Sequence, residues 1–342
     1  MPRAMGNKLR LLALAMLLAG TAFGQGRCHD GYGTPGCPLS RELATAPIKP
    51  VFTPTGWKTV ALDHITFVTP NYRREAAFYV ALMGWTLRRN EGNEVVLDIG
   101  DWGSAVFRGA PKLRAAAVDS ICWVIEPWNA RAVEAGLRVR GLTPLPDNDG
   151  HGFESFHVKD PNGFDLQISN GEGLAKARKT RAMSKLPALL TPPFVATGWK
   201  TVWLDHISYN AANYKQAASF YVNLLGWGTT YDEGSQHELT IDEIGDIIIR
   251  GGNPNNRAGL PPPRRERIDH ISFGIAPWNA DAMRSALRKR GLEARVDTAH
   301  GGDIHTATYK SYHLTTPNGF DLQISNVTHD TRLTVSNVVK PR

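Results

Sequence analysis

The hydrophobic and polar positions of this chain follow one order twice. Residues Thr55–Phe67 read TGWKTVALDHITF, and residues Thr197–Tyr209 read TGWKTVWLDHISY. Each stretch is rich in β-branched and aromatic residues, which predicts a strand, and each contains one histidine, His64 or His206. Such self-similarity within one chain indicates two copies of one structural unit.

The pattern continues after the repeated strand. The stretches NYRREAAFYVALMGW and NYKQAASFYVNLLGW carry apolar residues at helical spacing, as at Ala77, Val80 and Ala81. Three short strand candidates and a longer one follow. A second helix then begins at PWNA and ends at Gly141 or Gly291, since glycine suits the left-handed position after a helix. Three more strands end with FDLQIS in both copies. Each copy is therefore two β-α-β-β-β units, and the chain holds four.

These patterns predict two domains, each long enough to bury a core of its own. The predicted organisation is a signal peptide at 1–24, an extended N-terminal segment at 25–54, a first domain at 55–170, a basic linker at 171–196, a second domain at 197–326 and a C-terminal tail at 327–342.

The N-terminal residues have the pattern of a secretory signal peptide. Arg3, Lys8 and Arg10 occur without an acid and precede the apolar run LLALAMLLAG, and small residues follow around Ala22–Gly24. The apolar run is too short for a permanent membrane anchor. We therefore expect a periplasmic or secreted protein that has no membrane attachment after cleavage near Gly24.

The three cysteines fall into two environments. Cys28 and Cys37 lie in the Gly/Pro-rich stretch CHDGYGTPGC, which an exported protein can keep as a disulfide. Their spacing matches no common zinc pattern. Cys122 lies in the apolar stretch SICWVI, which predicts a buried free thiol.

The formal net charge of +7 does not indicate a nucleic-acid partner. Three of the basic residues belong to the signal peptide, five lie in the connector LAKARKTRAMSK, and others cluster in PPPRRER. The remaining domains are roughly balanced in charge, and no nucleic-acid-binding signature accompanies them. We expect a small molecule as the partner and leave a homodimer open.

Three motifs give the chain a family resemblance. They are DHI in the first strand, FYxxLxGW in the first helix, and the closing DPNGFDLQI and TPNGFDLQI. With this element order, residues 55–170 and 197–326 each resemble the vicinal oxygen chelate superfamily, which includes glyoxalase I, bleomycin-resistance proteins and extradiol ring-cleaving dioxygenases. The resemblance implies an α+β fold of four β-α-β-β-β units in two tandem domains, each an incomplete barrel.

In this superfamily metal ligands project inward from the first, fifth and eighth strands. In the second copy these positions hold His206, His270 and Gln323. The corresponding positions of the first copy are His64, Ser120 and Gln167. The resemblance therefore implies that a metal, if one is bound, lies in the second copy, and that the first copy is degenerate.

Two imidazoles and one oxygen ligand favour Fe(II) or Mn(II), with Zn(II) or Ni(II) as alternatives. Gln323 is a neutral amide where the family carries a glutamate, so it does not offset the charge of a metal. Asp321 lies two residues earlier on the same face of the strand and stays open as the alternative ligand.

Further residues of the second copy match catalytic positions of ring-cleaving dioxygenases. His313 stands where those enzymes have a tyrosine, and His305, with a slip of one residue, stands at the acid–base histidine. Arg250 ends the fourth strand, where glyoxalase I carries a ligating glutamate, so the four-ligand glyoxalase site is absent. If it points inward, Arg250 can clamp an anionic substrate.

Two functions remain open on these residues. The first is a divalent-metal-dependent enzyme that resembles an extradiol dioxygenase and acts on a small oxygen-chelating substrate, which His270 and His305 favour. The second is a metal-free small-molecule-binding protein of the bleomycin-resistance type, which Gln323 and His313 favour.

The N-terminal pattern makes the first testable prediction. We expect the mature protein to begin near Gln25 and to carry a bond between Cys28 and Cys37. N-terminal sequencing and mass analysis of exported protein check both expectations. Retention of Met1, or two free thiols at these cysteines, would contradict them.

Overall fold

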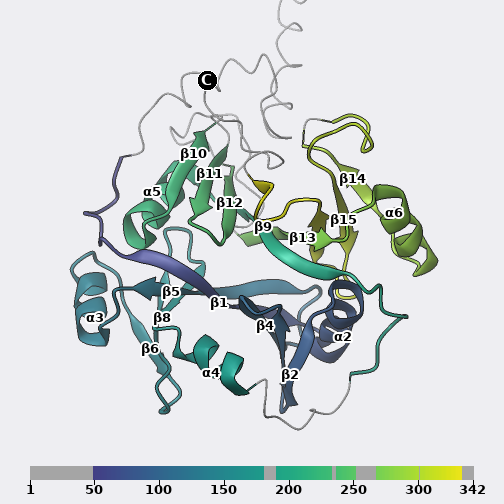
Figure 1. Cartoon of the computed structure of the whole chain (residues 1–342). Coiled ribbons are helices and arrows are strands. Elements are labelled where there is room, and N and C mark those ends of the chain that lie inside the picture. The colour runs from purple at the N-terminus through teal and green to yellow at the C-terminus, as the bar shows by residue number, and fades with distance from the viewer. Residues whose placement is uncertain (1–48, 181–189, 233–235, 252–266, 300, 333–342) are drawn as a thin grey trace, which may run out of the picture.

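The computed structural model describes residues 49–180, 190–232, 236–251, 267–299 and 301–332. These residues form two modules of the same architecture, stacked on each other in Figure 1. The predicted signal peptide, the predicted Cys28–Cys37 bond and the PPPRRER stretch lie outside the described residues. Among the described helices, none combines the length and the apolar character needed to cross a membrane.

The first module follows the predicted order of elements. It consists of β1 (Lys58–Thr69), α2 (Tyr72–Met83), β2 (Thr86–Glu91), β3 (Glu94–Ile99), β4 (Gly103–Gly109), β5 (Ala117–Glu126), α3 (Ala130–Arg138), β6 (Leu145–Asn148), β7 (Glu154–Lys159) and β8 (Asp165–Ser169). Its strands form one sheet in the order β2-β3-β4-β1-β5-β8-β7-β6.

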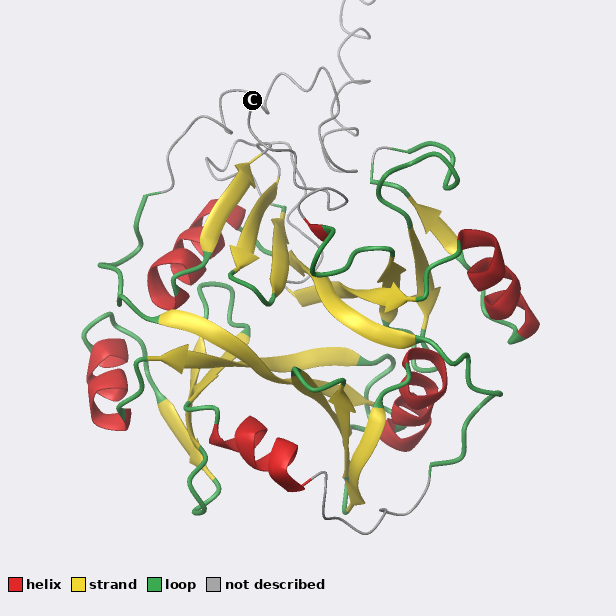
Figure 2. Ribbon diagram, viewed as in Figure 1, coloured by secondary structure: helices red, strands yellow, loops and turns green. Residues whose placement is uncertain are grey.

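The second module repeats this arrangement. It consists of β9 (Lys200–Asn210), α5 (Tyr214–Leu225), β10 (Gly228–Asp232), β11 (Gln236–Ile241), β12 (Gly245–Arg250), β13 (Arg267–Ala276), α6 (Ala280–Lys289), β14 (Arg295–Asp297), β15 (Ser311–Thr315) and β16 (Asp321–Ser325). The sheet order is β10-β11-β12-β9-β13-β16-β15-β14. Each curved sheet thus joins two β-α-β-β-β units, which confirms the predicted fold class (Figure 2).

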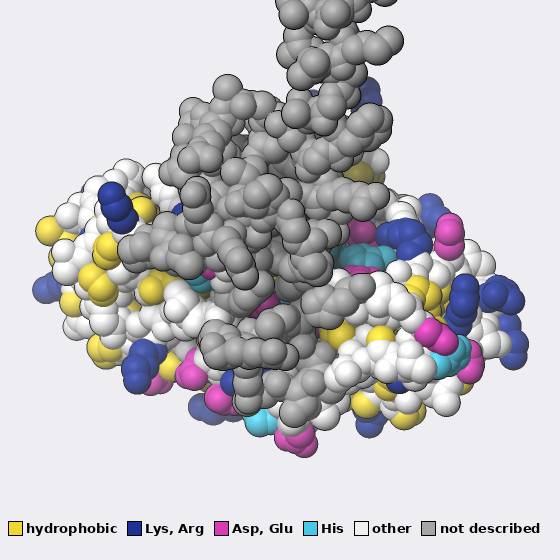
Figure 3. Space-filling model, turned by 90° about the horizontal axis from the view of Figure 1, so that it is seen from above, with side chains coloured by type: hydrophobic (Ala, Val, Ile, Leu, Met, Phe, Trp, Pro, Cys, Tyr) yellow, Lys and Arg dark blue, Asp and Glu magenta, His cyan; other side chains and the backbone are white. Residues whose placement is uncertain are grey.

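The connector between the modules contains an unforeseen helix. Residues of the predicted basic linker form α4 (Glu172–Thr180), whose Leu174 is buried. The ammonium group of Lys176 donates to the backbone carbonyl of His151 at 2.8 Å and approaches Asp149 at 3.4 Å. On the described surface in view in Figure 3, basic side chains are interspersed with acidic ones.

The repeated TGWKT and GW motifs hold the two modules together. The Trp85 indole donates to the hydroxyl of Thr201 in the second module at 2.8 Å, and the Trp227 indole donates to Thr59 in the first at 2.9 Å. One continuous apolar core accordingly includes buried residues of both modules.

The glycine before each of these tryptophans is needed for the same interface. Gly84 ends α2 and Gly226 ends α5, with φ of 69° and 73°. A Cβ on Gly84 would overlap the carbonyl of Trp199, and a Cβ on Gly226 would overlap the carbonyl of Trp57. Each glycine therefore permits the left-handed backbone that ends the helix, and its lack of a Cβ lets the backbone of the opposite module approach closely.

Buried polar contacts also cross this interface. The hydroxyls of Tyr209 and Tyr221 both donate to Asp160 of the first module, at 2.6 and 3.1 Å. On the other side, the Asn318 amide donates to the buried carboxylate of Glu75 at 2.7 Å. These groups are satisfied only when the modules are docked.

The Asp160 contact yields a stability prediction. Asp160→Ala leaves two buried tyrosine hydroxyls without their acceptor, and an unsatisfied buried polar group costs about 1–3 kcal/mol. We expect the free energy of unfolding, measured by urea titration, to fall by about 2 kcal/mol or more.

Asp149→Ala is the matched control. Asp149 accepts hydrogen bonds from the backbone of residues two and four positions later, as Asp160 does, but it lies on the surface and binds no tyrosine. An equal loss of stability in both variants would contradict the role of the tyrosine contacts.

Candidate metal centre

A β-bulge in β9 brings two consecutive side chains to the inner face of the second sheet. His206 lies opposite Ser272, and Leu204 lies opposite Phe273, so Asp205 is an extra residue. Its carboxylate accepts a hydrogen bond from Ser272 at 2.7 Å and lies 3.5 Å from His206 Nδ1. Strict alternation would have placed Asp205 on the face opposite His206.

Two buried histidines meet at this face. His206 Nε2 and His270 Nε2 are 3.2 Å apart, and each residue is 4% exposed. Burial is the main cause that lowers the pKa of His270 to about 3, so its ring is neutral near pH 7. Two nitrogens each about 2.1 Å from one ion, at an angle between a right angle and a tetrahedral one, would be about 3.0–3.4 Å apart. The pair fits two ligands of one divalent metal.

The partners of Gln323 leave its amide oxygen free. Its Nε2 is 2.7 Å from Ser311 Oγ, 3.0 Å from the Tyr309 hydroxyl and 3.2 Å from a carboxylate oxygen of Asp297. A carboxylate only accepts, so the amide nitrogen must face Asp297. The oxygen Oε1 is buried and has no hydrogen-bond partner among the described residues. Such an oxygen is suited to a cation.

The sheet register brings these predicted ligands to one face. Gln323 lies beside Ser272 on β13, and Ser272 lies beside His206 on β9. The residues therefore fit a divalent metal held by His206, His270 and Gln323. Asp321 is on the same face, but its Oδ1 already binds His313 and Arg295, each at 3.0 Å.

His313 lies beside the histidine pair, as its ring centre is 4.9 Å from that of His270. Burial alone would lower the pKa of His313, but the carboxylates of Asp297 and Asp321 outweigh it and raise the pKa to about 9. The ring is therefore an imidazolium at neutral pH. It can donate protons but cannot accept one.

Arg250 and His305 have different positions relative to this face. Burial is the largest cause of the lowered pKa of His270, the hydrogen bond with Asp269 opposes it, and the charge of Arg250 lowers it further. The Nε of Arg250 is buried and without a hydrogen-bond partner among the described residues. The His305 side chain is 54% exposed and lies 3.8 Å from Asp281 of α6. The structure does not bring His305 to the histidine pair.

Several polar residues around the site were missed in the sequence. Asp246 lies opposite His206 on β12 and is 4% exposed, and burial, followed by the charge of Asp205, raises its pKa to about 7. The Tyr309 hydroxyl donates to Asp205 at 3.0 Å. The only sign of Asp205 in the sequence is that it is the acid of the DHI motif, directly before His206.

The comparisons with known proteins bear on the fold. No family model and no curated protein matches this chain. Solved structures similar to it include the Mn(II)-bound glyoxalase from Novosphingobium aromaticivorans, at 18% identity and a TM-score of 0.56, covering 81% of this chain and 86% of that one.

Two dioxygenase structures are similar to the same extent. The 2,3-dioxygenase LapB from Pseudomonas sp. KL28 has 15% identity and a TM-score of 0.55, covering 83% of this chain and 94% of its own. A variant of homoprotocatechuate 2,3-dioxygenase from B. fuscum has 16% identity and a TM-score of 0.54, covering 82% and 74%. At these identities the likeness establishes the fold alone.

The histidine pair predicts where Mn(II) or Fe(II) binds. We expect His206→Ala and His270→Ala each to abolish binding of these ions, because either change leaves a single imidazole. His64→Ala, the matched change in the first module, should leave this binding intact. Titration calorimetry with Mn(II) on the three variants measures the effect, and an equal loss in His64→Ala would refute the assignment.

Proposed function

The chain has the fold of the vicinal oxygen chelate superfamily, and on that premise we propose that it is an exported, divalent-metal-dependent enzyme resembling an extradiol dioxygenase. Its substrate would be a small molecule that chelates a metal through two adjacent oxygens. The observation that carries the proposal is the buried pair of His206 and His270, whose Nε2 atoms face each other at 3.2 Å. The buried, unpartnered Oε1 of Gln323 supports it.

A carboxylate on the far side of each predicted ligand ring holds the ring in place. His270 Nδ1 lies 3.3 Å from Asp269 and His206 Nδ1 lies 3.5 Å from Asp205, so each ring has a carboxylate behind it and presents Nε2 to the other. Such carboxylates fix the tautomer and orientation of a metal-binding histidine. A divalent ion held there would supply Lewis acidity, and iron would add one-electron chemistry.

The charged residues of the site suit a substrate that carries negative charge. Arg250 has a free Nε and can bind an anionic group of the substrate. The imidazolium of His313, between Asp297 and Asp321, is able to donate a proton to a substrate oxygen. Its raised pKa makes it an acid under neutral conditions, unlike a histidine with an ordinary pKa, which would mostly act as a base.

The alternative is a metal-free binding protein of the bleomycin-resistance type. The specific observation in its favour is the amide nitrogen of Gln323, which already has three oxygen partners in Asp297, Tyr309 and Ser311. A network of this kind is largely complete without an ion. The pocket would then bind its ligand through Arg250 and the pair of His206 and His270.

Metal analysis separates the two functions. Protein purified from its native compartment should contain about one equivalent of iron or manganese at the His206–His270 site. It should also cleave catechol-type substrates at a detectable rate. Metal-free protein that still binds a small ligand tightly would favour the alternative.

Gln323→Glu tests the ligand that departs from the family pattern. The new carboxylate lies about where the amide was, close to the carboxylate of Asp297, so the metal-free variant should melt at a lower temperature than the parent protein. Mn(II) should compensate for this repulsion and bind about 1–3 kcal/mol more tightly, as is typical of charged over neutral contacts. Calorimetry and melting curves with and without Mn(II) measure both effects.

Gln167→Glu is the matched control, because the Gln167 amide has the same kinds of partner, Ser155 and Asp147, in the first module. It should lower the melting temperature without changing Mn(II) affinity at the histidine pair. If Gln323→Glu also loses stability with unchanged Mn(II) affinity, the metalloenzyme proposal is wrong.

A further inference from the structure

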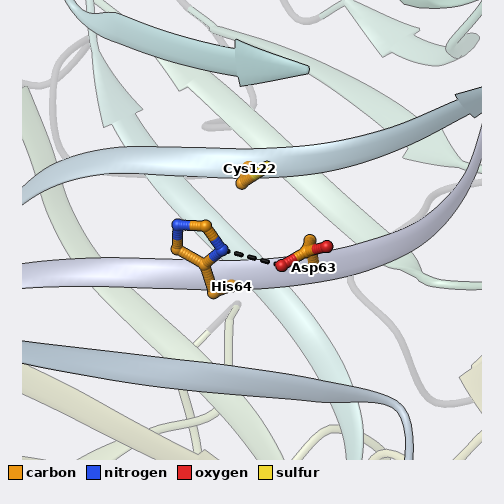
Figure 4. A group of neighbouring side chains, drawn as sticks. All are labelled: Asp63, His64 and Cys122. Carbon is orange, nitrogen blue, oxygen red and sulfur yellow. Dashed lines mark hydrogen bonds and ion pairs between the residues drawn. The ribbon is translucent and has the colours of Figure 1, made fainter. Parts of the chain in front are cut away.

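The first module contains a cluster of three different metal-binding side chains. Asp63, His64 and Cys122 each offer one ligand atom within 4.8 Å of the other two (Figure 4). His64 Nδ1 lies 2.8 Å from Asp63 Oδ1. Asp63 and Cys122 are buried, with 4% and 0% exposure, whereas the His64 side chain is 18% exposed.

The fold brings these residues together through the same bulge that shapes the second module. In β1, His64 lies opposite Cys122 and Leu62 lies opposite Trp123, so Asp63 is the extra residue. The bulge directs Asp63 and His64 to the same side, and the register sets Cys122 beside them on β5. The cluster is therefore fixed by the sheet and not by a loop.

The second module shows what the carboxylate of Asp63 lacks. There, the equivalent Asp205 accepts hydrogen bonds from the hydroxyls of Ser272 and Tyr309, at 2.7 and 3.0 Å. In the first module these two positions hold Cys122 and Phe153. A thiol is a weak donor and a phenyl ring is none.

Asp63 has fewer hydroxyl donors than Asp205. Within the described part of the chain, its carboxylate is contacted by His64 at 2.8 Å and by the hydroxyl of Ser169, which lies 3.4 Å from Oδ2. Burial and, next, the charge of Asp63 raise the pKa of the Cys122 thiol well above its ordinary value. A cation would stabilise both the carboxylate and a thiolate at this position.

We propose that Asp63, His64 and Cys122 form a second metal site that binds a thiophilic divalent ion of the zinc class. A carboxylate oxygen, an imidazole nitrogen and a thiolate are all zinc ligands, and thiolate selects such ions over manganese. Binding replaces the Cys122 S–H bond by a sulfur–metal bond and releases that proton to solvent. No electron transfer is involved.

The ion has a route to the cluster. Asp63 and His64 line a cavity of about 580 Å³, together with Ser104, Arg88 and Lys176. Four cations line this wall, and each has a carboxylate partner, so they do not present an unbalanced positive field. The pairs are Arg88–Asp98, Lys176–Asp149, Arg89–Glu94 and Arg108–Glu94. The cavity also leaves room for water or a small ligand at a fourth coordination position.

This site is separate from the centre proposed in the second module. The fifth-strand position that supplies His270 there is Ser120 here, so the sequence comparison placed no metal in this copy. Cys122 lies two residues further along the same strand, where the second module has Ser272. The inference does not depend on the proposed function.

Cobalt(II) distinguishes the two sites, because only a thiolate gives an intense sulfur-to-cobalt absorption in the near ultraviolet. The test uses the full chain with Cys28→Ser and Cys37→Ser, so that Cys122 is its only thiol. We expect Co(II) to produce the band and Zn(II) to remove it by displacement. Adding Cys122→Ser should abolish the band, and adding His64→Ala should weaken or abolish it.

Cys122→Ser introduces the residue that the second module has at the equivalent position, Ser272, so the fold should accept it. A melting curve verifies that the variant is folded. His270→Ala should keep the cobalt–thiolate band while losing Mn(II) binding. Absence of the band in the parent protein at saturating Co(II), or its persistence in Cys122→Ser, would overturn the inference. Failure of the proposed function would instead appear as Mn(II) binding that does not depend on His206 and His270.

Discussion

Both candidate sites of this protein depend on one extra residue in the first strand of each module. Asp63 and Asp205 are accommodated as β-bulges, which turn the acid and the next histidine to the same inner face. A buried carboxylate beside an imidazole is costly unless it is paired, so each module must provide donors or a cation around it. The two candidate sites differ in the residues by which each module meets this requirement.

The two modules share one sheet topology but surround the buried carboxylate with different residues. In the second, Ser272 and Tyr309 supply hydroxyl donors to Asp205, which leaves His206 to face His270. In the first, Ser120 replaces the second histidine and Cys122 stands beside Asp63. Both modules thus have the bulge, while the neighbouring strands give nitrogen and oxygen donors in the second module and a set that includes sulfur in the first.

The interface between the modules explains why some motifs are repeated so closely. The tryptophan of each GW motif donates to a threonine of the opposite first strand, and the preceding glycine makes room for the opposite backbone. Since each copy performs the same task for the other, both must keep the same residues. The fifth-strand ligand position is under no such reciprocal constraint, and there the copies differ, with Ser120 in one and His270 in the other.

The sequence by itself determined the order of elements and the two tandem modules, because these depend on local periodicity and on the repeat. The inward position of His206 and His270 was only implied by the family resemblance. The sequence did not determine that residues 172–180 are helical, that Asp205 faces inward, or that His305 lies outside the site. Those outcomes, like the free oxygen of Gln323 and the meeting of Cys122 with Asp63, depend on strand register and on contacts between residues far apart in the chain. Alternation along a strand assigns each residue a face, but a bulge shifts that assignment, and only the paired strand shows where the shift occurs.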